Sequence, residues 1–154
     1  MLTADEKRTI EAELGHCANP QAGAVEALRA VQQHRGWVSD QAVCDIADLL
    51  GLTAEEVDSI ATFYSMIFRE PVGRHVICVC DSVSCWIMGS ESIVDHLQRS
   101  LSIRPGETTD DRRFTLLPVG CLGACHLAPA MQVDDDLHGN LTPERIDEIL
   151  ETYA

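Results

Sequence analysis

The chain carries an apolar run, His75-Val76-Ile77-Cys78-Val79-Cys80, that leads directly into Asp81-Ser82-Val83-Ser84-Cys85. The first half of this stretch is short and rich in β-branched residues, which predicts a buried strand. The second half is rich in small and polar residues, which are typical of a loop. One cysteine therefore stands at the end of a predicted strand, and a second one follows it in the loop.

A second pair of cysteines repeats this arrangement further along the chain. The segment 113–119, RFTLLPV, predicts another strand, and Gly120-Cys121-Leu122-Gly123-Ala124-Cys125 follows it. Pro118 has no backbone N–H, so this strand should end there or lie at a sheet edge. Because both pairs follow strand ends, we expect the two loops to project from the same edge of one sheet and the four thiolates to meet there.

Four converging thiolates with few competing ligands favour either zinc or an iron-sulfur cluster. Both spacings, Cys-x4-Cys and Cys-x3-Cys, are also used by structural zinc, so spacing alone leaves the choice open. A Rieske centre requires two histidine ligands, and only His126 adjoins a pair. The plant-type ferredoxin spacing is not met either, because the next cysteine after Cys85 is Cys121.

Chain length and cysteine number support metal binding over disulfides. The chain has 154 residues and seven cysteines, and a chain of this size needs no disulfides to hold a core. An odd number of cysteines without an export signal indicates reduced thiols, for which metal binding is a common use. Cys17, Cys44 and Cys78 lie outside the two pairs, and we expect them to be ordinary buried thiols.

The N-terminal part predicts a small helical bundle. Two capping boxes mark helix starts, at Thr3 with Glu6 and at Thr53 with Glu56. Apolar spacing predicts two more helices, over 24–35 and 40–50, each followed by a glycine. The segment 69–73, REPVG, then breaks the helical pattern. We therefore expect a helical bundle over residues 1–70 and a second domain over residues 71–154.

The second domain mixes strands with helices. A helix is predicted over 90–100, between the two strands, and the segments 130–134 and 137–141 predict a hairpin. The run Asp134-Asp135-Asp136 is expected to be the solvated turn of that hairpin. Thr142 and Pro143 mark the start of a final helix. The expected fold class is α+β, with a helical bundle followed by a small α/β domain.

The charge balance excludes several classes of partner. The chain has 11 Lys and Arg against 25 Asp and Glu, a net charge of −14 with neutral histidine. Such a charge repels phosphate backbones and anionic lipid headgroups. Residues 41–64 imitate a helix-turn-helix, but they carry acids and no Lys or Arg, which argues against DNA binding. The sequence also has no long apolar span and no export signal, so we expect a cytoplasmic protein with no direct membrane insertion.

Several of these segments closely resemble one known family. Residues 73–76 leading into Cys80–Cys85, residues 114–118 leading into 120–125, and Ala128-Pro129-Ala130 are similar to the thioredoxin-like 2Fe-2S subunit of respiratory NADH:quinone oxidoreductase, the NuoE type. The segments 33–38, QHRGWV, and 61–65, ATFYS, extend this resemblance into the helical part. It covers roughly residues 24–150.

The resemblance implies a thioredoxin-like ferredoxin fold for the second domain and one 2Fe-2S cluster as its cofactor. Carried over by position, Cys80, Cys85, Cys121 and Cys125 are the four cluster ligands, which leaves a zinc module with four cysteine ligands as a remote alternative. No catalytic residues are expected in this chain, because hydride chemistry belongs to a flavin. The chain is then an enzyme only as a subunit of NADH:quinone oxidoreductase.

The resemblance also implies a partner and a place in the cell. The helical bundle should dock on the flavoprotein subunit that holds FMN and the NADH site, and the complex should lie peripherally on the inner face of the membrane, in the respiratory chain. The alternative is the equivalent 2Fe-2S diaphorase subunit of an NAD-dependent formate dehydrogenase or an NAD-reducing hydrogenase. When isolated, the chain would leave its docking surface uncovered, which favours self-association.

The sequence also predicts the placement of four side chains near the cysteine pairs. Trp86 and Met88, next to the second cysteine, are expected to form a hydrophobic lid over the cluster loop. His126 is expected to be an exposed spectator. Cys78 lies two residues before Cys80 and should share its face of the strand.

Overall fold

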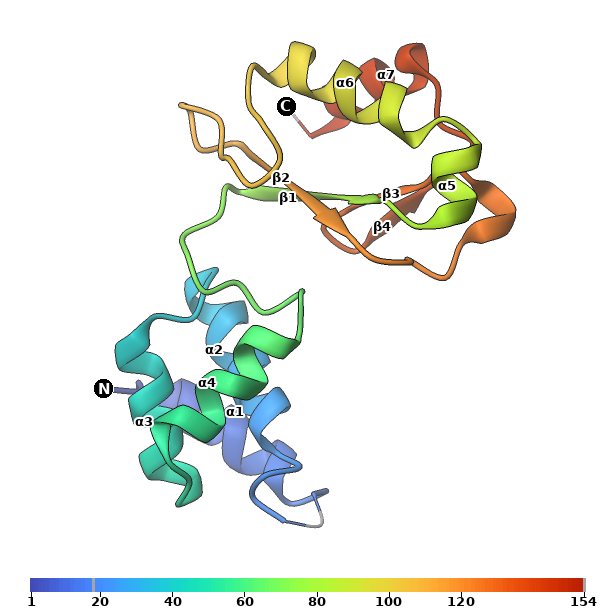
Figure 1. Cartoon of the computed structure of the whole chain (residues 1–154). Helices are drawn as coiled ribbons and strands as arrows, with labels where there is room; N and C mark the ends of the chain where they lie inside the picture. Colours follow the sequence, from blue (N-terminus) through green and yellow to red (C-terminus); the bar gives the residue numbers. More distant parts are fainter. Residues whose placement is uncertain (18, 154) are drawn as a thin grey trace. The chain divides into compact units, whose positions relative to one another are not determined.

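The computed structural model describes residues 1–17 and 19–153, and the chain divides into two compact units, Met1–Pro71 and Val72–Ala154 (Figure 1). The described part of the first unit contains the helices α1 (Ala4–Leu14), α2 (Ala24–Arg35), α3 (Asp40–Leu50) and α4 (Ala54–Phe63). Each of these helices was predicted from the sequence, and all are confirmed.

Local signals in the sequence fix the helix ends. The Thr3 hydroxyl accepts from the Glu6 N–H at 3.2 Å, and the Glu6 carboxylate accepts from the Thr3 N–H at 2.7 Å. The box at Thr53 and Glu56 repeats both bonds, at 3.2 and 2.9 Å. Both capping boxes are therefore confirmed, and α2 and α3 end at glycine caps as predicted.

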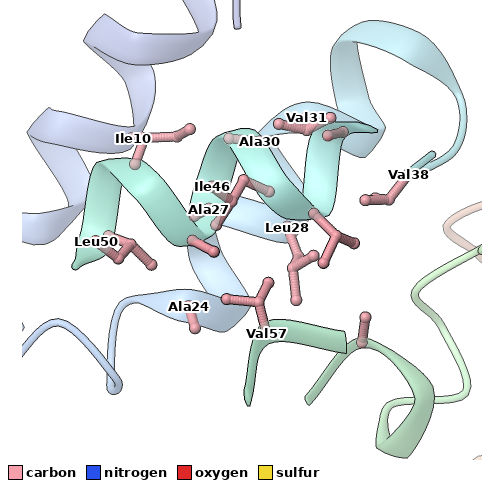
Figure 2. Close-up of a cluster of buried hydrophobic side chains, with 14 of the residues drawn as sticks. Ile10, Ala24, Ala27, Leu28, Ala30, Val31, Val38, Ile46, Leu50 and Val57 are labelled. Atoms are coloured by element: carbon pink, nitrogen blue, oxygen red, sulfur yellow. The ribbon is translucent and has the colours of Figure 1, made fainter. Parts of the chain in front are cut away.

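The helical unit has its own apolar core. Ile10 from α1, Leu28 from α2, Ile46 from α3 and Val57 from α4 point toward one another and are completely buried (Figure 2). Burying one such side chain contributes about 1.5–3 kcal/mol. The apolar spacing that predicted the helices is thus the spacing that fills this core.

A buried ion pair joins α1 to α2. The Glu6 carboxylate, 1% exposed, accepts from the Arg35 Nε at 2.5 Å and from its Nη2 at 2.6 Å. Because the Arg35 guanidinium bonds it so closely, the pKa of Glu6 falls from 4.5 to about 2, although burial acts in the opposite direction. Glu6 of the capping box of α1 therefore also makes a tertiary contact with α2.

The segment after α4 is held by polar side chains of the same unit. Gln32 donates to the Met66 carbonyl at 2.8 Å and accepts from the Phe68 N–H at 2.6 Å. Arg69 contacts Asp40 at 2.7 Å and Asp58 at 2.9 Å. These bonds keep residues 66–69 against the helices.

The second unit is built on a four-stranded sheet with the strand order β2-β1-β3-β4. Its elements in chain order are β1 (His75–Cys80), α5 (Val83–Ile87), α6 (Ser90–Leu101), β2 (Phe114–Val119), the 3-10 helix η1 (Cys125–Leu127), β3 (Met131–Val133), β4 (Asp136–His138) and α7 (Pro143–Thr152). Strands β1 and β2 are parallel, whereas β3 pairs antiparallel with both β1 and β4. Pro118 lies in the edge strand β2, in line with its missing donor.

Helices α6 and α7 lie side by side over one face of the sheet (Figure 1). Ile77 and Val79 of β1 belong to the same buried cluster as Leu97 of α6 and Ile146 of α7. Because side chains alternate along a strand, Cys78 and Cys80 are on the other face. Cys78 and Cys80 are buried and share a face, as predicted.

The structure adds elements that the sequence pattern did not predict. Helix α5 and the 3-10 helix η1 lie in the two segments interpreted as loops. The hairpin is also shifted, because β4 begins at Asp136, so that Asp134 and Asp135 form the turn and Asp136 pairs with Val133. Of the helices within residues 1–17 and 19–153, none has the length and apolar character needed to cross a membrane.

Candidate metal centre

The parallel pairing of β1 and β2 positions the two cysteine pairs. Cys80 lies opposite Val119 in the register, so Cys121 follows only two residues beyond the neighbour of Cys80. The Asp81 N–H donates to the Val119 carbonyl at 3.1 Å, which continues the pairing past the last strand residue. The two pairs therefore leave the sheet at the same edge, as the sequence predicted.

Cys80 and Cys85 form a buried pair. Both are 2% exposed, and they pack with Ala124, Ala128 and Ala130 in a small apolar cluster. The turn into α5 brings Cys85 back toward the strand end, where its thiol hydrogen-bonds to the Cys80 sulfur. This half of the site is shielded from water.

Cys121 and Cys125 form an exposed pair. Their sulfur atoms lie 3.6 Å apart. Gly123, between them, has a φ of 76°, a left-handed conformation that glycine adopts without strain. This turn directs the Gly123 N–H at the Cys121 sulfur at 3.3 Å.

Hydrogen bonds and charge link the two pairs. The Leu122 N–H, from the second loop, donates to the sulfur of Cys80 in the first. The sulfur of Cys125 is close enough for its charge to raise the pKa of Cys85. The four thiols predicted as ligands are therefore brought together, although they are far apart in the sequence.

The surroundings shift the pKa values of the two buried thiols in opposite directions. Burial acts to raise the pKa of Cys80, but hydrogen bonds from the N–H groups of Leu122 and Ser82 and from the Cys85 thiol outweigh it, and the pKa is lowered. Burial and the bond to Cys80 raise the pKa of Cys85, against an opposing bond from the Ala130 N–H. Backbone N–H groups thus favour a thiolate at the end of β1.

The thiols have the chemistry of a zinc or iron-sulfur centre. Two thiolates on one tetrahedral metal, each about 2.3 Å from it, have sulfurs about 3.8 Å apart, which is close to the 3.6 Å between Cys121 and Cys125. N–H donors aimed at sulfur are the interactions that tune such clusters. Within residues 1–17 and 19–153, no three His, Cys, Asp or Glu side chains gather around a single ion position. The thiols form two pairs, Cys80 with Cys85 and Cys121 with Cys125.

The other three cysteines do not belong to the two pairs. Cys78 is buried, and burial, with a smaller effect of Asp134, raises the pKa of its thiol to about 11. Cys17 is partly exposed and Cys44 is exposed, so the expectation that both are buried is wrong. Cys44 lies on α3 between Val43 and Ile46, and at that helical position its side chain faces away from the core.

Of the two predictions about side chains next to the cysteine pairs, one is correct and one is wrong. His126 is exposed, as predicted. Trp86 and Met88 are 57% and 59% exposed, and neither belongs to the apolar cluster around Cys80 and Cys85. The predicted lid is therefore wrong, and Leu122 is the larger apolar side chain that packs there.

Sequence reasoning missed the N–H donors of Ser82 and Ala130, because backbone groups leave no residue-type signal. It also missed α5, which a pattern could have shown. Val83, Trp86 and Ile87 have the i, i+3, i+4 spacing of one helix face, and Ser82 before them is a common N-cap residue.

The family described as thioredoxin-like 2Fe-2S ferredoxin matches residues 10–154. The match covers the sheet, both cysteine pairs and most of the helical unit. The chain belongs to this family, so the thioredoxin-like fold and the 2Fe-2S cofactor implied by the resemblance are confirmed.

Similarity to individual proteins gives a more specific result than the family match. The chain is 54% identical over 152 residues to the E subunit of NADH-quinone oxidoreductase from Escherichia coli (strain K12), covering 99% of this chain and 92% of the relative. It is 51% identical over 154 residues to the E subunit of the same oxidoreductase from Pseudomonas aeruginosa, covering 100% and 93%. A crystal structure of an NAD+-reducing NiFe-hydrogenase in the air-oxidized state aligns with a TM-score of 0.71 and 26% identity, over 98% of this chain and 24% of that chain.

Proposed function

We propose that this chain is the electron-transfer subunit that carries one 2Fe-2S cluster beside the FMN- and NADH-binding subunit of an NADH:quinone oxidoreductase. One observation carries the proposal. Two cysteine pairs meet at one sheet edge, in a chain that is 54% identical to the E subunit of such an oxidoreductase over 99% of its length.

Cys80, Cys85, Cys121 and Cys125 would hold the cluster as thiolates. The buried pair would bind one iron in a water-free pocket, and the exposed pair would bind the other near the surface. The lowered pKa of Cys80 supports this role, because a thiol must lose its proton to become a ligand. When bound, such a cluster supplies reversible one-electron transfer.

Backbone groups would compensate the negative charge that four thiolates bring to an acidic chain. The N–H groups of Ser82 and Leu122 point at Cys80, that of Ala130 at Cys85 and that of Gly123 at Cys121. Hydrogen bonds to cluster sulfurs raise the reduction potential. Electron transfer requires no acid, base or nucleophile from the protein, and we assign no catalytic residue to this chain.

The chain would act within a larger assembly. It would lie against the flavoprotein subunit that oxidises NADH, with the helical unit contributing to that contact, at the inner face of the membrane. An equivalent diaphorase subunit of an NAD-reducing hydrogenase is the second candidate, because such a structure aligns over 98% of this chain. The identity of 26% to that protein, against 54% to the Escherichia coli relative, favours the quinone-linked assembly.

Anaerobic purification followed by iron and acid-labile sulfide analysis tests the cluster. We expect about two irons and two sulfides per chain, and a spin-half EPR signal after reduction by dithionite. Reconstitution with the FMN-bearing subunit then tests the role, because NADH should reduce the cluster only when that subunit is present. Zinc without sulfide would overturn the proposal.

A further inference from the structure

The exposed cysteine pair differs from the buried pair in its access to solutes. The sulfurs of Cys121 and Cys125 lie 3.6 Å apart, and both residues are exposed. Cys80 and Cys85 also hydrogen-bond to each other, but each is only 2% exposed and packs among alanines. Of the two pairs, only the exposed one therefore presents two adjacent thiols to a reagent in water.

The distance between the two exposed sulfurs suits a disulfide. A disulfide bond is about 2.05 Å long, so these sulfurs have to approach each other by about 1.5 Å. Exposed side chains rotate freely enough to supply a movement of this size. The loop around them is also uncrowded, because a Cβ at Gly120 or Gly123 meets no atom within 4 Å. The turn can therefore close around a new bond without displacing a neighbour.

We infer that Cys121 and Cys125 form an oxidation site, at which a peroxide converts this pair, and not Cys80 with Cys85, into a disulfide before the cluster is inserted. The disulfide itself follows from the distance and the exposure of the two thiols. Its consequence rests on the proposed function, because it matters only if all four thiols have to be ligands.

The step balances with hydrogen peroxide as the oxidant. The sulfur of one thiol attacks the O–O bond, which gives a sulfenic acid and releases one water. The sulfur of the second thiol then displaces the hydroxyl group, which leaves with the thiol proton as a second water. The two thiols thus lose two electrons and two protons, and the peroxide is reduced to two waters.

The disulfide keeps the exposed pair in a reversible state. Oxidation stops at this bond instead of continuing to a sulfinic acid, and a dithiol restores both thiols by exchange. While the bond is present, two of the four proposed ligands are not available as thiolates. Cluster insertion then depends on prior reduction of Cys121 and Cys125.

The test uses the full chain, freed of its cluster by a chelator, reduced, and then treated with hydrogen peroxide. Thiols are alkylated in denaturant before digestion with trypsin, which cleaves after Lys and Arg. The two pairs then lie in separate peptides, 75–99 and 114–145, and Cys44 lies in the peptide 36–69. We expect peptide 114–145 to be unalkylated and two hydrogen atoms lighter than its reduced form, while peptide 75–99 is fully alkylated.

Cluster rebuilding measures the consequence. The oxidised wild-type chain should take up about tenfold less iron and sulfide than the reduced chain, and a dithiol should restore the uptake. Cys125→Ser removes the second thiol, so its Cys121 should be oxidised to a sulfinic acid that a dithiol does not reverse. Cys44→Ser is the matched control, because it removes an exposed thiol that belongs to neither pair. Its peptide 114–145 and its uptake should match wild type.

Two results would overturn the inference. If peptide 114–145 is still alkylated at a peroxide concentration that oxidises Cys44, the pair reacts no faster than a single exposed thiol. If peptides 75–99 and 114–145 become cross-linked, a thiol of the first peptide takes part and the exposed pair is not a separate site. Failure of the reduced wild-type chain to take up iron and sulfide would instead overturn the proposed function, while the digest still decides whether the disulfide forms.

Discussion

The two units of the chain are stabilised in different ways. The helical unit is held by contacts between neighbouring helices around one apolar core, with the Glu6–Arg35 pair as a buried polar contact. The second unit has a similar core between its sheet and two helices, but it also has a smaller cluster around Cys80 and Cys85. The first unit is held together by contacts among its own side chains. The second also keeps four thiols together, which we propose as the ligands of its cluster.

The cysteines show this difference most directly. Cys17 and Cys44 in the helical unit are at least partly exposed. In the second unit, backbone N–H groups point at the sulfurs of Cys80, Cys85 and Cys121. Cysteines in the helical unit are therefore ordinary side chains, whereas those of the two pairs in the second unit lie in a site built from backbone N–H groups. Residue identity alone does not separate these cases.

Removing one organised thiol should produce the largest effect. Cys80→Ser or Cys121→Ser is expected to abolish the cluster, because a hydroxyl is a much poorer iron ligand than a thiolate. Iron and sulfide content with EPR of the reduced protein measures the loss. Cys17→Ser and Cys44→Ser are the matched controls and should retain full cluster content. Loss of the cluster in the Cys44 variant, with the Cys121 variant unaffected, would reverse the assignment.

Breaking the buried ion pair should destabilise the helical unit while leaving the cluster in place. The pKa of Glu6 is about 2 in the folded chain against 4.5 ordinarily. Its stabilisation is therefore complete above pH 4.5 and is lost as the pH falls toward 2, by up to about 3 kcal/mol. Glu6→Gln should remove a similar amount at neutral pH.

The two tryptophans allow each unit to be followed separately, since Trp37 lies in the first and Trp86 in the second. In a Trp86→Phe background, denaturant unfolding monitored by Trp37 fluorescence reports on the helical unit. Glu56→Gln is the control, because this second capping box is exposed and should lose only about 0.5–1 kcal/mol. Equal losses for the two variants would show that the Arg35 contact adds nothing.

Within the second unit, the turn at Gly123 should contribute a smaller amount to cluster retention. Its φ of 76° is unfavourable for any residue with a Cβ, so Gly123→Ala should cost about 1 kcal/mol. Cluster loss to a chelator should then be about fivefold faster. Gly120→Ala is the control in the same loop, because a Cβ there meets no atom within 4 Å. Identical loss rates would mean that the turn does not hold the ligands.

The smallest effect is expected at the C-terminal end of the second unit. Burial and the bond from its hydroxyl to Asp136, at 2.8 Å, raise the pKa of Tyr153 from 10 to about 12. The associated stabilisation is complete below pH 10 and is lost as the pH rises through 12. Tyr153→Phe should cost about 0.5–1 kcal/mol in thermal unfolding. Tyr64→Phe, at a half-exposed position in the helical unit, should cost less.

Local chemistry in the sequence was enough to predict the helical unit. Capping boxes and apolar spacing act within four residues, so the starts of α1 and α4 and the bounds of α2 and α3 followed from neighbours in the chain. Strand β1 and the start of α7 were predicted for the same reason. The cysteine pattern predicted a thiolate metal site, and the resemblance to the family then implied the 2Fe-2S cofactor, because both signals lie in short segments.

Tertiary structure decided what depends on distant parts of the chain. The pairing of β1 with β2 brings Leu122 to the sulfur of Cys80, and no pattern in either segment contains that contact. The burial of Cys85 against the exposure of Trp86 also depends on which face of α5 meets the sheet. Whether a cysteine is a ligand, a core thiol or an exposed side chain is set by its neighbours in space, and for Cys80 one of these neighbours is a backbone N–H group from the other loop.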